Sequence, residues 1–373
     1  MSRRRKKKKS KIVLFAVELI ILVGLLGGLY VYSKLDKVDS TGQIEEKEVN
    51  IDLDSETAEV LKGYTNIAIF GLDNRQNGKY DGGNSDCIMI ASINNDTKKV
   101  KLLSVYRDTF LNTKEGAYNK INSAYATGGA KGAVSALNKN LNLDIVNYIS
   151  VDFRALVEAV DLIGGVEITL TDQEAQIMND NYIDEINGVA GKNSTKMSGG
   201  GTYLLDGVQT LAYCRIRYTT GLDFKRTERQ REVLMKMFEK TKEAGIGTIG
   251  GLIDTMFDEI STSYTSGDLL KLASSLMDYE VEGSHGWPFE LCTGTFGAKG
   301  DIVVPTDLET NVKELHEYLF NETNTVSSAV NEISDYIINY TGCTTSATSR
   351  FDNPLTGDDN TSSDPEYVPE EDE

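Results

Sequence analysis

The chain has 373 residues, of which 57 are Asp or Glu and 38 are Lys or Arg, giving a formal net charge of −19. A chain this acidic lacks the basic surface that nucleic-acid binding requires, so we expect no nucleic acid among its partners. Its hydrophobic residues, 40% of the total, are enough for a soluble domain with a sizeable core.

Residues 1–11 are basic, and an apolar run follows at residues 12–32. A helix of about 20 apolar residues is long enough to cross a membrane. Because flanking cations are retained in the cytoplasm, we expect a cytoplasmic tail at residues 1–11, a transmembrane helix at 12–32 and the rest of the chain outside the cell. A cleaved signal peptide is the alternative, but no small-residue cleavage site follows the run.

Residues 33–63 are polar and charged with little periodicity. They predict an extracellular stalk, so the folded part is expected to begin at residue 64. Beyond that point, short apolar runs predict strands. These runs cover residues 66–71, 86–93, 100–105, 148–151 and 166–170. Turn residues between the second and third runs predict that those two strands form a hairpin.

Helical patterns alternate with these strands and continue after them. They cover residues 121–141, 153–163, 205–212, 227–242, 246–260, 266–279, 308–320 and 326–340. The polar, Gly-rich residues 172–202 predict a long surface loop. Helices alternating with strands, together with one hairpin, predict a three-layer α-β-α arrangement around a central mixed sheet.

We therefore divide the chain beyond the stalk into three parts. Residues 64–245 are expected to form the main α/β domain, and residues 246–343 a helical C-terminal extension. Residues 344–373, rich in Ser, Asp, Pro and Glu, are expected to form a disordered acidic tail.

Arginine is concentrated in one stretch, since five of the nine arginines beyond residue 11 lie within residues 215–231. A guanidinium binds phosphate oxygens in pairs and stays charged, so this stretch predicts a local anion site. Arg215 and Arg217 point to the same side of an extended chain. On the helix that follows, Arg226 and Gln230 lie one turn apart, in line with core-facing residues and near a helix N-terminus that favours anions.

Arg229 and Arg231 lie off that inward-facing line. We expect both on a solvated surface, paired with Glu228 and Glu232.

Carboxylates stand at the ends of the predicted strands. Asp73 follows the first strand, Asp86 opens the second, and Arg107 and Asp108 follow the third. Loops at strand ends are where α/β sheets place ligands. Each Asp alone is more often a turn or cap residue. Together with the arginines, Asp73 and Asp86 predict a site for Mg²⁺, or Mn²⁺, bridging to phosphate oxygens.

Other kinds of site are poorly supported. His285 and His316 are the only histidines and lie far along the chain from the arginines, which disfavours Ser-His-Asp catalysis and His-ligated zinc. Residues 128–132 do not have the spacing of a Walker loop, so ATP is not expected as the phosphate donor.

The four cysteines form no metal-binding pattern. Cys87 and Cys214 lie in apolar segments and are expected to be buried. Cys292 and Cys343 are candidates for a disulfide outside the cell.

Several motifs occur in a characteristic order. They are Gly71-Leu72-Asp73-Asn74-Arg75, Ser85-Asp86, Ser104-Val105-Tyr106-Arg107-Asp108, Lys120-Ile121-Asn122-Ser123-Ala124-Tyr125, Val160-Asp161-Leu162-Ile163-Gly164-Gly165-Val166, Leu205-Asp206-Gly207, Leu211-Ala212-Tyr213-Cys214-Arg215-Ile216-Arg217 and Asp223-Phe224-Lys225-Arg226-Thr227-Glu228-Arg229-Gln230. In this order they resemble the LytR-CpsA-Psr family of Gram-positive bacteria, over about residues 64–238.

The resemblance implies an enzyme that takes a teichoic-acid-like or capsular polymer from a polyprenyl diphosphate carrier and joins it to peptidoglycan by a phosphodiester. It implies that Asp73 and Asp86 hold the metal, and that a buried apolar tunnel takes the lipid. The residues implied around the diphosphate are Arg75, Arg107, Arg215, Arg217, Arg226 and Gln230. One departure is Asn84, which stands where the family commonly has Arg.

The expected chemistry is electrostatic stabilisation of phosphoryl transfer, in which Arg107 acts as a charge. Because a guanidinium stays protonated, Arg107 is a poor base, and Asp108 or Asp223 is the alternative. Two rival functions stay open from the sequence. One is a non-catalytic envelope regulator that binds the lipid-linked polymer, and the other is a hydrolase of the lipid diphosphate.

Overall fold

The computed structural model describes residues 44–49, 51–73, 80, 82–217, 222–256, 260–265, 268–269, 272, 275–322 and 325–344. The expected basic tail, transmembrane helix and almost all of the acidic tail lie outside these residues. Within them, no helix combines the length and the apolar character needed to span a membrane.

A six-stranded mixed sheet lies at the centre of the molecule, with the strand order β10-β3-β2-β1-β6-β9. Its strands are β1 (Tyr64–Leu72), β2 (Ser85–Asn94), β3 (Lys99–Val105), β6 (Asn147–Val151), β9 (Ile260–Thr262) and β10 (Glu280–Trp287). β1 pairs parallel with β6, and β3 with β10, whereas β2 runs antiparallel to both of its neighbours. The predicted mixed sheet and its hairpin are confirmed.

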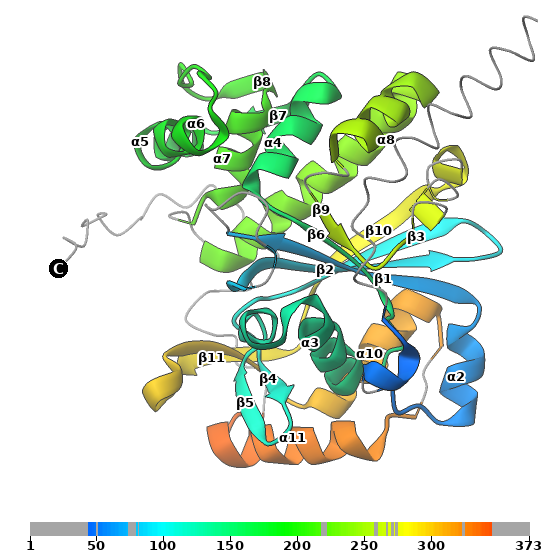
Figure 1. Cartoon of the computed structure of the whole chain (residues 1–373). Helices are drawn as coiled ribbons and strands as arrows, with labels where there is room; N and C mark the ends of the chain where they lie inside the picture. Colours follow the sequence, from blue (N-terminus) through cyan, green and yellow to red (C-terminus); the bar gives the residue numbers. More distant parts are fainter. Residues whose placement is uncertain are drawn as a thin grey trace, which may run out of the picture.

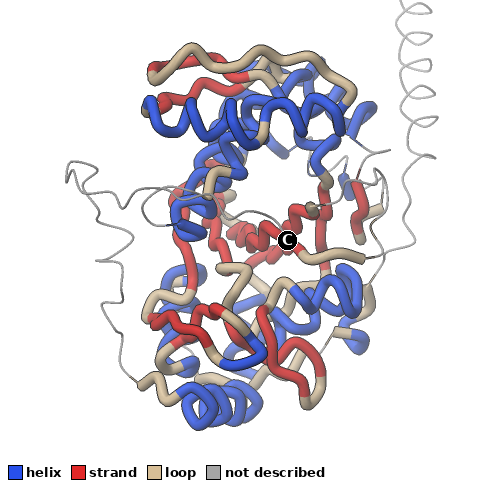
Figure 2. The backbone as a smooth tube through the Cα atoms, turned by 90° about the vertical axis from the view of Figure 1, so that its left-hand side faces the viewer, coloured by secondary structure: helices blue, strands red, loops and turns tan. Residues whose placement is uncertain are grey.

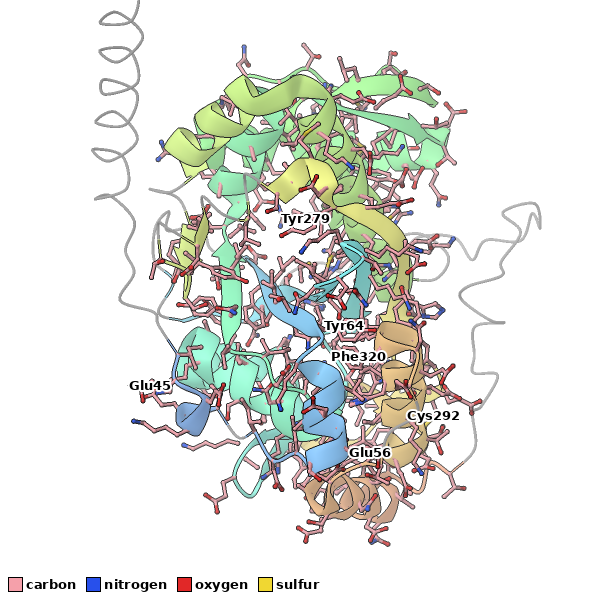
Figure 3. All side chains as sticks on the ribbon, turned by 90° about the vertical axis from the view of Figure 1, so that its right-hand side faces the viewer. Glu45, Glu56, Tyr64, Tyr279, Cys292 and Phe320 are labelled. Atoms are coloured by element: carbon pink, nitrogen blue, oxygen red, sulfur yellow. A yellow bond between two sulfur atoms is a disulfide. The ribbon has the colours of Figure 1, made fainter. Side chains whose placement is uncertain are left out.

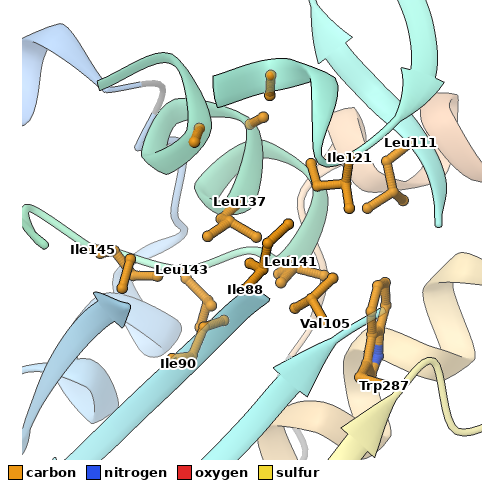
Figure 4. Close-up of a cluster of buried hydrophobic side chains, with 14 of the residues drawn as sticks. Ile88, Ile90, Val105, Leu111, Ile121, Leu137, Leu141, Leu143, Ile145 and Trp287 are labelled. Atoms are coloured by element: carbon orange, nitrogen blue, oxygen red, sulfur yellow. The ribbon is translucent and has the colours of Figure 1, made fainter. Parts of the chain in front are cut away.

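Helices cover both faces of this sheet (Figure 1). α3 (Ser123–Leu141) and α10 (Leu308–Phe320) lie on one face. α4 (Phe153–Leu162), α7 (Gly207–Arg215) and α8 (Leu222–Met256) lie on the other. Side chains alternate along a strand, so β2 sends Ile88 and Ile90 into the core beneath α3, where Trp287 is also fully buried (Figure 4).

Close backbone packing brings β1 and β2 together near the site described below. Gly71 stands opposite Cys87 in the ladder, and a Cβ on Gly71 would lie 2.8 Å from the Cβ of Cys87. Only glycine fits there without moving one strand. The pairing register shifts between Gly71 and Leu72, so that Leu72 stands opposite Ser85.

The segment expected to be a stalk is folded over part of its length, so that prediction is wrong there. α2 (Ser55–Leu61) is capped by Asp54, and Val49 and Leu61 are fully buried in the main core. Glu56 marks α2 in Figure 3, where Tyr64 and Phe320 also appear; their rings meet edge to face with centroids 4.9 Å apart.

Residues 172–202 were expected to form a loop, and that prediction is also wrong. They contain α5 (Asp172–Asn181) and α6 (Ile183–Ala190), and β8 (Gly201–Leu205) pairs with β7 (Val166–Leu170). A capping box between Thr171 and Glu174 starts α5. The few apolar side chains of α5 and α6 are buried in a second core beneath α4 and α7, which is enough to hold otherwise polar helices.

The region expected to be a helical extension also contains strands. α8 continues from Leu222 to Met256 and crosses the expected boundary at residue 245. β10 then joins the central sheet, and β11 (Leu291–Thr295) pairs with β12 (Asp301–Pro305) before α10 and α11 (Ser328–Thr341). Residues beyond 245 therefore complete the main fold, rather than forming a separate helical part.

A disulfide joins Cys292 of β11 to Cys343, just beyond α11, as proposed from the sequence. It closes a loop with a sequence separation of 51 residues. Cys214 is buried and Cys87 half-buried, and neither is in a disulfide.

We expect Cys292→Ser to lower the free energy of unfolding by about 2–5 kcal/mol, because the cross-link restricts the unfolded chain. Denaturant unfolding with and without reductant measures the change. Cys343→Ser should give the same loss, and the double variant should lose no more than either single variant. Additive losses would show that the thiols act separately.

Candidate active site

Three arginines from distant parts of the chain converge on one carboxylate, Asp86. Arg107 donates from Nη1 to Oδ1 of Asp86 at 2.8 Å. Arg217 donates from Nη2 to Oδ2 at 3.0 Å. Arg226 donates from Nη2 to the backbone oxygen of Asp86 at 2.8 Å, and its Nη1 lies 3.7 Å from Oδ2. These three side chains therefore form one cationic cluster.

Two further carboxylates hold this cluster together. Asp223 lies 3.3 Å from Arg107, 3.3 Å from Arg226 and 4.0 Å from Arg217. Asp108 lies 3.5 Å from Arg107 and 3.2 Å from the ammonium of Lys120. The cations Arg107, Arg217, Arg226 and Lys120 outnumber the carboxylates Asp86, Asp108 and Asp223, so the cluster keeps a positive charge that favours an additional anion.

The topology explains why these residues meet. β2 is antiparallel to β1 and β3. The first residues of β2, including Asp86, therefore lie beside the C-terminal ends of β1 and β3, on the same side of the sheet. Asp73 follows β1 at this edge, and Arg107 follows β3. Asp223 and Arg226 lie in the first turns of α8, whose N-terminus reaches the edge from the helical layer.

A cavity of about 360 Å³ leads from this cluster into the space between the sheet and the helices. Figure 2 shows the backbone of the helices and of the sheet from the side. Asp73, Asp86, Arg215, Arg217 and Arg226 line its polar part. Deeper in, the lining is apolar and comes from β1, β2, α4, α7 and α8: Ile69, Met89, Phe153, Leu156, Leu211, Val233, Leu234 and Met237.

Burial and charge act in opposite directions at the cluster. Burial raises the pKa of Asp86, but the guanidiniums of Arg107, Arg226 and Arg217 outweigh it and hold that pKa below its ordinary value. Burial likewise works against the charge of Arg107, but Asp223, Asp86 and Asp108 raise its pKa. Arg226 is 2% exposed, and its pKa is lowered by burial and by the two neighbouring arginines, against the attraction of Asp223.

Because folding lowers the pKa of Asp86, the free energy of unfolding should depend on pH. A group whose pKa is depressed by folding stabilises the protein above its unfolded pKa, near 4, and loses that contribution as the pH falls through its folded pKa. We therefore expect Asp86→Asn to destabilise the protein at neutral pH and to differ progressively less from the wild type below about pH 4. Chemical unfolding at several pH values measures this; a constant difference would contradict it.

Arg215 and Gln230 also line the cavity, but neither contacts Asp86. Arg215 pairs with Glu185 at 3.1 Å, and its guanidinium lies over the rings of Phe153 and Tyr182, 4.8 and 5.0 Å from their centroids. Gln230 donates to the backbone oxygen of Cys214 at 3.4 Å. The structure thus places both of them behind the cluster, on the wall of the cavity.

The surface position predicted for Arg229 and Arg231 is wrong, since these residues are 7% and 5% exposed. Arg229 pairs with Glu174 of α5 at 2.9 Å, so its guanidinium is buried in an ion pair between α8 and α5 rather than exposed to solvent. Arg231 is buried with Nη1 unpartnered, close to Tyr106, and its pKa is lowered by burial.

The sequence model of the LytR_cpsA_psr family matches residues 27–284. This chain belongs to the LytR-CpsA-Psr family. It is 27% identical over 279 residues to the polyisoprenyl-teichoic acid–peptidoglycan teichoic acid transferase TagU of Enterococcus faecalis, covering 74% of this chain and 84% of the relative.

Solved structures share the fold. One is TagT bound to LI-WTA, with a TM-score of 0.56, 22% identity and coverage of 76% of this chain and 98% of the other. Another is the LytR-CPS2A-psr family protein YwtF (TagT) with bound octaprenyl pyrophosphate lipid, with a TM-score of 0.53, 20% identity and the same two coverages.

In this LytR-CpsA-Psr chain the two predicted metal ligands lie at one sheet edge and line one cavity. Asp73 is exposed, whereas Asp86 is already bonded to arginines. Among the residues described, no group of three or more His, Cys, Asp and Glu side chains forms a metal-type cluster. Two carboxylates nonetheless suit Mg²⁺, which keeps several waters and takes the rest of its ligands from phosphate. Arg75 lies outside the described residues.

Sequence reasoning missed several residues of this LytR-CpsA-Psr site. Phe153, Tyr182 and Glu185 surround Arg215, and Asp152 lines the cavity while capping α4. Tyr182 and Glu185 fell in the supposed loop, so the capping box at the start of α5 was the one available signal.

Proposed function

We propose that this chain is a membrane-anchored transferase whose folded part lies outside the cell. It moves an anionic glycopolymer, teichoic-acid-like or capsular, from a polyprenyl diphosphate carrier to peptidoglycan. Membership of the LytR-CpsA-Psr family supports this, as does the activity named for the Enterococcus relative.

The observation that carries the proposal is a cationic cluster at one end of an apolar cavity. A ligand that fits both parts has a charged diphosphate and a long hydrocarbon chain. The charge would be neutralised by Arg107, Arg217 and Arg226. The hydrocarbon would lie among the apolar side chains, where each buried methylene contributes about 0.8 kcal/mol. Nucleotides and free sugar phosphates have no hydrocarbon chain to fill the apolar part of the cavity.

In the proposed reaction, a sugar hydroxyl of peptidoglycan attacks the phosphorus atom that carries the polymer. A new phosphorus–oxygen bond forms, the bond to the lipid phosphate breaks, and polyprenyl monophosphate leaves. Charge neutralisation and alignment dominate such transfers, and the three arginines are placed to supply the first. Arg107 and Asp108 do not line the cavity that would hold the lipid, so the acceptor would approach from their side.

The hydroxyl proton goes to Asp108 in this scheme. Asp223 lies within 4.0 Å of three guanidiniums, so its oxygens are already engaged in holding the arginines. Asp108 faces one guanidinium and one ammonium, Arg107 and Lys120. We therefore assign the base to Asp108 and an orienting role to Asp223, which fixes the arginines.

Asp73 and Asp86 would hold Mg²⁺ or Mn²⁺, and the ion would neutralise diphosphate oxygens when bound. We expect chelation of the metal to suppress transfer and Asp73→Asn to require a higher magnesium concentration for half-maximal rate. The rate measured against metal concentration gives the shift. Asp96→Asn, an exposed turn substitution, is the control and should leave the curve unchanged. Full activity in chelator would remove the metal from the scheme.

The test of the function supplies lipid-linked polymer, peptidoglycan and magnesium to the full-length protein. We expect polymer joined to peptidoglycan by a phosphodiester, together with released polyprenyl monophosphate. Free polymer with lipid monophosphate would instead identify a hydrolase. Binding of the lipid-linked polymer without release would identify the regulator.

The anchor at residues 12–32 and the external location are part of the same proposal. Protease added to intact cells should remove the folded part and leave the basic tail protected. Protection of the folded part would place it on the cytoplasmic side.

A further inference from the structure

An exposed pair of aromatic rings lies on α11, away from the cavity. Tyr336 and Tyr340 are 43% and 44% exposed, which is unusual for large side chains with an apolar body. They lie one helical turn apart, and their rings are parallel to within 5° with centroids 6.2 Å apart. α11 lies beside the hairpin of β4 (Phe110–Lys114) and β5 (Ala117–Lys120) (Figure 1).

Each exposed ring is supported from behind by a ring of that hairpin. Tyr118 stacks on Tyr336 with centroids 3.7 Å apart, and Phe110 stacks on Tyr340 with centroids 5.2 Å apart. Since one face of each α11 ring is covered, its exposed area belongs to the opposite face and the edge. The two tyrosines thus present a flat, fixed aromatic surface to solvent.

The ends of α11 and of the hairpin are held in place. Cys343, three residues after Tyr340, is disulfide-bonded to Cys292. Lys299 donates to the backbone oxygen of Tyr118 at 2.6 Å. A rigid aromatic surface loses little entropy when a ligand packs on it.

We propose that Tyr336 and Tyr340 form a platform that binds a neutral saccharide chain. The C–H-bearing face of a sugar ring carries a weak positive potential and packs against the negative face of an aromatic ring. Exposed polar side chains of the same helix, Glu332, Asp335 and Asn339, can bond to sugar hydroxyls. Two of these are carboxylates, which would repel a polymer with phosphate in its backbone, so the charge favours a neutral glycan.

The position of the hairpin suggests that the bound glycan is the acceptor in the transfer reaction. Phe110 is two residues from Asp108 in sequence. Lys120, the last residue of β5, forms an ion pair with Asp108 at 3.2 Å. The amide of Asn122 donates to the backbone oxygen of Arg107 at 3.1 Å. The rings that support the platform therefore belong to the same hairpin that adjoins the acceptor side of the arginine cluster. Taking the glycan to be the acceptor strand rests on the proposed function, whereas saccharide binding itself does not.

The test titrates the full-length protein with chitotetraose, a neutral oligomer of N-acetylglucosamine, by calorimetry. We expect wild-type binding, a Kd raised at least about tenfold by Tyr336→Ala, and a Kd within about twofold of wild type for Tyr336→Phe, which keeps the ring. Circular dichroism checks that each variant is folded. Saturation-transfer NMR on the wild-type protein should show the sugar-ring protons in contact with tyrosine, independently of any variant.

A separate control distinguishes the platform from the transfer site. Arg217→Ala should bind chitotetraose as well as the wild type, even though we expect it to lose transfer. The platform is overturned if the wild type does not bind the oligomer, or if Tyr336→Ala with Tyr340→Ala binds it unchanged. Stronger binding of poly(glycerol phosphate) than of chitotetraose at these tyrosines would also overturn it. Loss of transfer in an Arg217 variant and loss of saccharide binding in a Tyr336 variant are separate results, so either proposal can fail alone.

Discussion

Replacing Arg217 by Ala should lower kcat/KM for polymer transfer by about 10²–10³. This is the usual effect of removing one donor from a site that stabilises charge developing in the transition state. Arg217 donates to Asp86 from the wall of the cavity, and its side chain is 40% exposed, so its removal should cost the fold less than it costs activity. Steady-state rates with lipid-linked polymer, measured alongside the melting temperature, separate loss of activity from loss of fold.

Arg154→Ala is the matched control. Arg154 belongs to α4 and pairs with Glu158 on the same helix, with a side chain 41% exposed, close to the value for Arg217. Its removal takes away the same charge without touching the cluster, so transfer should be unchanged. Equal losses in the two variants would mean that overall charge, rather than the convergence on Asp86, accounts for the effect.

Replacing Leu156 by Trp should weaken binding of a long-chain lipid diphosphate by about 10²-fold. Leu156 lines the apolar part of the cavity. An indole there displaces roughly four methylenes of the lipid, and at about 0.8 kcal/mol for each the loss is about 3 kcal/mol. Lipid donors of graded chain length provide the measurement. The variant should lose most of the advantage that the wild type gains from long chains.

Leu162→Trp makes the same change on the same helix at an exposed position. It should keep the chain-length dependence of the wild type. If Leu156→Trp binds long and short lipids as the wild type does, the hydrocarbon lies somewhere other than this cavity.

The parts of the fold predicted well from the sequence are those with strong local patterns. β1, β2 and β3 are continuous apolar runs, and the helix predicted at residues 308–320 has the bounds of α10. β10 was missed because its glycines and charged residues break the apolar pattern, and its partner β3 lies about 180 residues earlier. A strand stabilised by so distant a neighbour carries little information in its own residues.

The same distinction applies to the site. The sequence grouped Arg107, Arg217 and Arg226 in one candidate site, because Arg217 and Arg226 lie in the arginine-rich stretch, Arg226 near a helix N-terminus, and Arg107 follows a predicted strand. Their convergence on Asp86 needed the structure. Arg229 was misplaced because its partner Glu174 lies 55 residues away, in a helix that sequence patterns did not reveal. When the partner of a charged residue is remote in sequence, local sequence patterns predict that the residue is exposed to solvent even if it is buried.

The pairing of β10 with β3 affects the stage of synthesis at which the arginine cluster can form. The amide of Tyr106, the residue before Arg107, donates to the backbone oxygen of Trp287 at 3.0 Å, so the loop that carries Arg107 is supported by the last residue of β10. Synthesis proceeds from the N-terminus, and β10 ends only at residue 287 of 373. A nascent chain therefore acquires its complete arginine cluster late, after most of its length has been made. A chain that ends before β10 would lack this support for the loop of Arg107.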